Sequence, residues 1–97
     1  MTKNEILNFL KEHKSELQEK YGVTSIGLFG SYAKDCATKK SDVDLAIQMK
    51  DESKTLSNYM KLKRFLERNL KSKVDLGIED TIKTAVRNSI LTEIIYV

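Results

Sequence analysis

Apolar residues recur at helical spacing over the first twenty positions of the chain. Glu5 follows Thr2 at the spacing of a capping box, in which each residue satisfies a free backbone amide of the other. The apolar face that follows consists of Ile6, Leu7, Leu10 and Leu17. Gly22 can end the helix because glycine adopts the left-handed conformation without strain. The pattern predicts one amphipathic helix of about five turns that ends at Tyr21.

The next segment predicts a buried strand and then a turn. Residues 23–29 are mostly apolar and contain β-branched side chains, and the run ends at Gly30 and Ser31. A strand of this length would bring the glycine and the serine to the surface of the protein. Residues 32–40 are rich in lysine, which predicts a short turn or a single helical turn.

Two later stretches alternate between apolar and polar residues, as half-buried strands do. Residues 41–49 and residues 73–79 each show this period of two. In the first stretch, the side chains opposite the apolar face are those of Asp42, Asp44, Ala46 and Gln48. The second stretch places Asp75 at a polar position. Each stretch therefore predicts a strand with one apolar face and one face that begins with acidic residues.

Two further helices are predicted in the second half of the chain. Residues 53–71 have helical period, with basic side chains between the apolar ones. The apolar positions are Leu56, Tyr59, Leu62, Leu66 and Leu70, and the basic ones are Lys61, Lys63, Arg64, Arg68 and Lys71. Asp80 or Thr81 can cap a last helix that runs through Ile90, and the final five residues form its end or a short extended tail.

The order of these elements predicts an α/β (α+β) fold, a small mixed β-sheet that is covered on one face by helices. The polar face of the sheet would then stay open for a ligand. A chain of 97 residues with 40% hydrophobic residues can build one modest core, so we expect residues 1–97 to form a single domain.

Composition narrows the classes of function. The 17 basic and 14 acidic residues are mixed along the chain, and a net charge of +3 is too small to indicate a dedicated nucleic-acid binder. No apolar stretch has the length of a membrane span or the form of a secretory signal, so we expect a cytoplasmic protein. With only one cysteine and one histidine, Cys36 is expected in a loop and His13 on a helix face, without a metal or disulfide role.

The aspartates are the candidate chemistry. On a strand, the Cα atoms of Asp42 and Asp44 would lie about 6.5–7 Å apart, with both side chains on one side. Carboxylates at this distance repel unless cations lie between them, and Mg²⁺ suits a site built only from carboxylate oxygens. Asp75 would complete a cluster of three if its strand lies alongside. The spacing of Ser41 and Asp44 also fits a helix-capping box, and a solvated strand end is the other simple explanation.

The residues also carry a resemblance to a known family. The motif GSYA at residues 30–33 is followed by SDVDL at 41–45 and KVDL at 73–76. This combination resembles the minimal nucleotidyltransferase (MNT) family of the DNA polymerase beta superfamily over nearly the whole chain. The resemblance implies the nucleotidyltransferase fold. Where the family commonly has Arg-Gly after the first motif, this chain has Lys34 and Asp35.

The resemblance implies roles for individual residues. Asp42 and Asp44 match the metal-binding carboxylates of the family, and Asp75 matches its third acid, a metal ligand or a base. The residues expected to contact the nucleotide are Gly30, Ser31, Lys34 and Ser41. Two Mg²⁺ ions are the implied cofactors and ATP is the implied substrate.

The resemblance also implies a function. Family members transfer a nucleoside monophosphate to an acceptor hydroxyl, and small members are often antitoxins that attach AMP to a tyrosine of a HEPN-family ribonuclease toxin. We therefore expect a Mg-dependent protein adenylyltransferase that assembles with a HEPN toxin and has no membrane partner. The alternative is a weak or inactive member that neutralises its partner by binding alone. Nucleic-acid binding by the basic helix is a third hypothesis, for which a solvated helix face is the simpler explanation.

Overall fold

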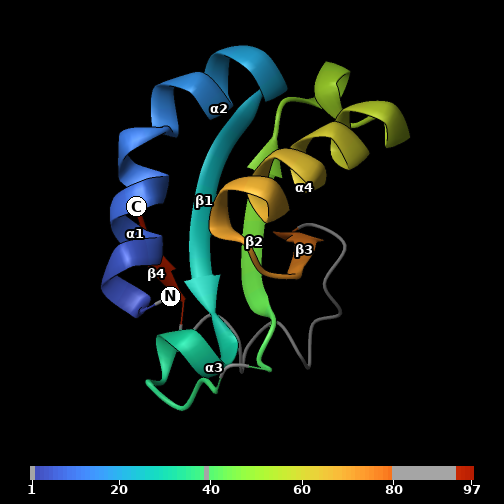
Figure 1. The fold of residues 1–97 in the computed structure, drawn as a ribbon. Helices are drawn as coiled ribbons and strands as arrows, with labels where there is room; N and C mark the ends of the chain where they lie inside the picture. Colours follow the sequence, from blue (N-terminus) through green and yellow to red (C-terminus); the bar gives the residue numbers. More distant parts are fainter. Residues whose placement is uncertain (1, 39, 80–93) are drawn as a thin grey trace.

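The computed structural model describes residues 2–38, 40–79 and 94–97 (Figure 1). The helices are α1 (Lys3–Glu12), α2 (Lys14–Tyr21), α3 (Gly30–Ala33) and α4 (Leu56–Leu70), and η1 (Asp51–Ser53) is a short 3₁₀ turn. The strands are β1 (Val23–Phe29), β2 (Val43–Met49), β3 (Val74–Ile78) and β4 (Ile95–Tyr96). The predicted last helix lies outside the described residues. The extended alternative for the end of the chain is confirmed by β4.

The strands form one mixed sheet in the order β3-β2-β1-β4. β1 runs antiparallel to both β2 and β4, whereas β2 and β3 are parallel. A parallel pair needs a crossover connection, and α4 provides it between β2 and β3. β2 therefore lies between the strand that ends at Gly30 and the strand that carries Asp75.

One face of the sheet forms the core together with three helices. Ile26 of β1 pairs with Ile47 of β2, and Leu45 of β2 pairs with Leu76 of β3, so their side chains share a face. The core that covers this face also contains Ile6, Leu10 and Leu17 from α1 and α2, and Leu62, Leu66 and Leu70 from α4. The predicted fold, a small mixed sheet with helices packed on one face, is confirmed.

The first helix is interrupted, whereas the sequence predicted a continuous one. His13 separates α1 from α2 with φ −100° and ψ 6°, and Figure 1 shows the change of direction between the two helices. Its ring stacks on Phe9 with centroids 4.2 Å apart, and Nδ1 lies 2.9 Å from the carbonyl oxygen of Phe9. The imidazole is therefore within hydrogen-bond distance of a carbonyl group in the last turns of α1, and this local contact favours ending the helix there. His13 is half-buried at this junction and does not lie on a helix face.

α4 begins later than predicted. The hydroxyl of Thr55 accepts a hydrogen bond from the backbone amide of Asn58 at 3.1 Å, which fixes the start of the helix at Leu56. The side chain of Leu56 was expected in the core and is 77% exposed, because the first turn of α4 extends beyond the sheet. Within the part of the chain that the structure describes, no helix has the length and apolarity required to span a membrane.

The polar face of the sheet is less open than predicted. Ala46 is buried, and the side chain of Gln48 donates a hydrogen bond to Glu79 at 3.0 Å. The hydroxyl of Tyr96 donates to the other carboxylate oxygen of Glu79, which is itself buried. This face is therefore closed at one end by a polar network. It stays accessible at the other end, where Asp42 and Asp75 are exposed.

Candidate active site

The turn at the end of β1 is in contact with one of the aspartates. Gly30 has φ +74°, a conformation that residues with a Cβ rarely adopt. Phe29 pairs with Asp44 in the β1–β2 ladder, so the turn begins beside this acid. A Cβ at Gly30 would lie 2.1 Å from Oδ2 of Asp44. The glycine thus allows both the turn and the close approach of the carboxylate.

The turn continues into α3, which begins at Gly30 beside Asp44. The first amides of a helix have no partner within it and can hold a phosphate group. Tyr32 is buried and anchors the short helix on the core. The carbonyl of Ser31 accepts a hydrogen bond from the amide of Cys36 at 2.9 Å, which closes the loop after the helix. The turn at Gly30 and Ser31 is therefore fixed from both sides.

The three aspartates are brought together by the strand order. Asp44 and Asp75 are direct neighbours in the parallel β2–β3 ladder and share one face, as the cluster requires. Asp42 lies just before β2, because the strand begins at Val43 and not at residue 41 as predicted. Burial raises the pKa of Asp44 above its ordinary value, and the charges of Asp75 and Asp42 raise it further. The protein thus gathers negative charge around the half-buried Asp44.

The aspartates suit a divalent cation by their chemistry. All three offer hard carboxylate oxygens, and a cation would relieve the repulsion from Asp75 and Asp42 that, after burial, raises the pKa of Asp44. Within residues 2–38, 40–79 and 94–97, no three acidic, histidine or cysteine side chains converge closely enough to hold one ion. The three aspartates nevertheless fit Mg²⁺ by their charge and donor type, and Asp44 and Asp75 also share a register position in the sheet.

A polar hollow of about 240 Å³ adjoins the acids on the side of β3. It is lined by Asp42, Lys63, Glu67, Lys73, Val74 and Asp75. Glu67 accepts a hydrogen bond from the amide of Val74 at 3.0 Å, which ties α4 to the start of β3. The helical pattern predicted Lys63 on a solvated face of its helix. Its spacing of four residues from Glu67 indicates that the two side chains lie on the same side of the helix. Only the packing of α4 against β3 brings that side next to Asp42 and Asp75.

Comparison with known proteins agrees with this geometry. The sequence profile of the nucleotidyltransferase domain family matches residues 10–97. The chain belongs to this nucleotidyltransferase family. Protein adenylyltransferase MntA of Thermococcus cleftensis is 37% identical over 97 residues, which are 100% of this chain and 97% of that protein.

Solved structures show the same fold for this nucleotidyltransferase. A minimal nucleotidyltransferase matches it with a TM-score of 0.81 and 30% sequence identity, over 98% of this chain and 95% of that one. A crystal structure of a variant of the toxin-antitoxin pair MntA-HpeT matches with a TM-score of 0.67 and 25% identity, over 100% of this chain and 72% of that one. The resemblance expected from the GSYA, SDVDL and KVDL motifs is confirmed.

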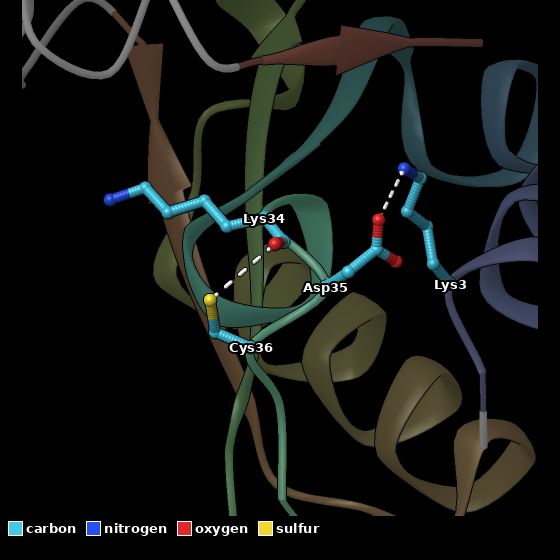
Figure 2. Close-up of polar contacts among 4 residues, drawn as sticks. All are labelled: Lys3, Lys34, Asp35 and Cys36. Carbon is cyan, nitrogen blue, oxygen red and sulfur yellow. Dashed lines mark hydrogen bonds and ion pairs between the residues drawn. The ribbon is translucent and has the colours of Figure 1, made fainter.

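In this nucleotidyltransferase, Asp35 stands where the family commonly has glycine. Asp35 adopts φ +58°, a left-handed conformation that aspartate tolerates better than most residues. Its carboxylate forms an ion pair with Lys3 of α1 at 3.2 Å (Figure 2). Figure 2 shows the side chain of Lys34 extending to the opposite side. The negative charge of Asp35 is therefore paired with Lys3 of α1.

The remaining predicted residues lie in the loop between α3 and β2. The hydroxyl of Ser41 accepts a hydrogen bond from the amide of Thr38 at 2.9 Å and so shapes the loop before Asp42. The alternative in which Ser41 and Asp44 cap a helix is wrong, because Asp44 lies within β2. Cys36 is exposed in this loop, as expected, and its thiol donates to the carbonyl of Lys34 at 3.4 Å (Figure 2).

Proposed function

We propose that this nucleotidyltransferase is a protein adenylyltransferase that transfers AMP from ATP to a hydroxyl, that of a tyrosine, on a HEPN-type toxin and thereby acts as its antitoxin. The observation that carries the proposal is the contact between Asp44 and the turn at Gly30, with Asp75 on the other side of Asp44. Similarity to protein adenylyltransferase MntA over the whole chain supports the choice of AMP and of a protein acceptor. The likeness to the MntA-HpeT toxin-antitoxin pair supports a toxin as the partner.

The phosphate tail of ATP would be held at the end of β1. The amides at Gly30 and Ser31 would bind the phosphates at the start of α3, and the exposed Lys34 would neutralise charge on them. Ser41 would contact the nucleotide from the loop before β2. These groups orient the α-phosphate beside Asp44 and leave its far side free for the acceptor.

The transfer itself needs no covalent intermediate on the protein. The acceptor oxygen attacks the α-phosphorus in line with the bond to the bridging oxygen of the β-phosphate, that bond breaks, and pyrophosphate leaves with the electron pair. The hydroxyl proton passes to Asp75 or to water. Two Mg²⁺ ions held by Asp42, Asp44 and Asp75 would polarise the attacking oxygen and neutralise charge on the leaving group. Positioning and charge compensation therefore supply the rate.

An antitoxin that acts by binding alone is the second candidate. Its support is the pair Lys34 and Asp35, since lysine lacks the planar fork with which arginine holds phosphate oxygens. The ion pair between Asp35 and Lys3 weakens this case, because it compensates a negative charge that would otherwise repel the nucleotide.

Mass spectrometry of the HEPN-type partner separates the two candidates. We expect the partner to gain one or more AMP units after incubation with this protein, Mg²⁺ and ATP, and the double variant Asp42→Asn/Asp44→Asn to abolish the gain while it keeps its fold. Transfer by the double variant would refute the roles of the two acids. A stable complex without any AMP gain by the wild-type protein, and protection of cells by the double variant, would establish neutralisation by binding.

A further inference from the structure

Asp44 lies on β2, between β1 on one side and β3 on the other, and these two strands bring different groups next to it. β1 ends at the turn of Gly30, and β3 carries Asp75 on the opposite side of β2 (Figure 1). In an in-line displacement the attacking and leaving groups lie on opposite sides of the phosphorus. If the proposed function holds and pyrophosphate leaves toward Gly30, the acceptor hydroxyl must approach from the side of β3.

The polar hollow lies on this side and carries two lysines with no ion pair in the described part of the chain. Lys63 comes from α4 and Lys73 from the residue before β3, and both line the hollow together with Asp42 and Asp75. The nearest acid on α4, Glu67, uses its carboxylate to accept from a backbone amide. The hollow thus combines the acids proposed for catalysis with two cations that can take an acidic ligand.

The same flank of α4 continues into an exposed apolar surface. Leu56, Met60, Lys63 and Glu67 follow one another at spacings of four, three and four residues, which places them on one side of the helix. Leu56 is 77% exposed and Met60 is 36% exposed. We call the surface formed by Leu56, Met60, Lys63 and Lys73 the acceptor flank. It leads from an apolar end to a basic end beside Asp75.

We propose that the toxin segment that carries the acceptor hydroxyl docks along the acceptor flank. Acidic side chains next to the hydroxyl pair with Lys63 and Lys73, and apolar side chains of the same segment cover Leu56 and Met60. This arrangement presents the hydroxyl at Asp75, opposite the turn at Gly30. Charge complementarity at the basic end selects the acceptor, and the apolar end supplies contact area.

Lys61 and Arg68, seven residues apart on a different face of α4, provide a matched control. Lys61, Arg64 and Arg68 line a second hollow with Tyr21 and Phe65, of about 270 Å³. None of the three aspartates of the site borders it. A neutral substitution of two cations there removes the same charge as a substitution of Lys63 and Lys73. It does so away from the path proposed for the acceptor.

The test measures both binding of the HEPN-type partner and transfer of AMP to it, with the full-length chain. The double variant Lys63→Gln/Lys73→Gln and the exposed-site variant Leu56→Asn are compared with the control Lys61→Gln/Arg68→Gln. We expect the double variant to weaken partner binding and to raise the KM for the partner by about tenfold, with the affinity for Mg-ATP unchanged. Leu56→Asn should weaken binding in the same direction, and the control should behave as the wild type.

The two readouts keep this inference separate from the proposed function. If the wild type transfers AMP and Lys63→Gln/Lys73→Gln binds and transfers as the wild type does, the acceptor flank is refuted and the proposed function stands. If no variant transfers AMP but only the acceptor-flank variants lose binding, the docking surface stands and the transferase function falls. An equal loss of binding in the control would show a general effect of charge and overturn the inference.

Discussion

The substitution Gly30→Ala tests whether the close approach of the β1 turn to Asp44 organises the site. Gly30 has φ +74°, and an L-residue in this region costs about 1–2 kcal/mol. For a domain of this size, such a loss lowers Tm by roughly 5–15 °C. The new Cβ would also lie 2.1 Å from Oδ2 of Asp44, so the carboxylate must rotate away from the turn. A displacement of about 1 Å can cost about 100-fold in rate.

We therefore expect Gly30→Ala to fold with a reduced Tm and to transfer AMP to the partner about 100-fold more slowly at saturating ATP. Gly22→Ala is the matched control, since Gly22 has φ +70° and its Cβ would lie 2.0 Å from Oγ of Ser53, at the other end of β1. The control should lose at least as much Tm and keep its transfer rate. A Gly30→Ala protein that loses stability like the control but transfers AMP at the wild-type rate would refute the reasoning.

Three further predictions concern single side chains. Because burial and neighbouring charges raise the pKa of Asp44, ionisation of this group destabilises the folded state once the pH exceeds its ordinary pKa. Asp44→Asn should therefore raise the free energy of unfolding of the metal-free protein at pH 7, and urea unfolding in EDTA should show this gain disappear as the pH falls below the ordinary pKa of aspartate. Glu79→Ala removes a buried acceptor for two side-chain donors and should lower the free energy of unfolding by about 1–3 kcal/mol, with Glu79→Gln losing less. Asp35→Ala should lower the free energy of unfolding by about 1 kcal/mol in thermal unfolding, because alanine fits φ +58° poorly. Asp35→Gly should stay within about 0.5 kcal/mol of the wild type, because the ease with which glycine adopts this φ offsets the loss of the surface ion pair with Lys3.

Local periodicity predicted most of the elements well, and it failed at their ends. β1 has the predicted bounds because its apolar run ends at a glycine. The start of α4 was predicted too early, since the helical period of the apolar residues does not reveal which threonine or serine caps the helix. The interruption at His13 was missed because it depends on how one ring packs against Phe9. The exposure of Leu56 was missed for the same reason, because this residue lies in the first turn of α4.

The candidate site was predicted as a set of residues but not as an arrangement. The acids Asp42, Asp44 and Asp75 and the turn at Gly30 were all selected from motifs and alternation. The sequence left open whether the strand of Asp75 lies beside that of Asp44. It also gave Lys63 no role apart from a solvated helix face. Both points depend on where α4 and β3 pack, which no local pattern reports.

The sequence by itself determined most of the residues that face the core, where the chain must turn through glycine, and which strand positions carry acids. These properties follow from the backbone geometry of a few neighbouring residues, so they can be read along the chain. Only the tertiary structure decided that β3 pairs in parallel with β2 and that Lys63 and Lys73 border the same hollow as Asp75. Strand order depends on burial shared by segments far apart in the sequence, and it alone makes one site out of separate motifs.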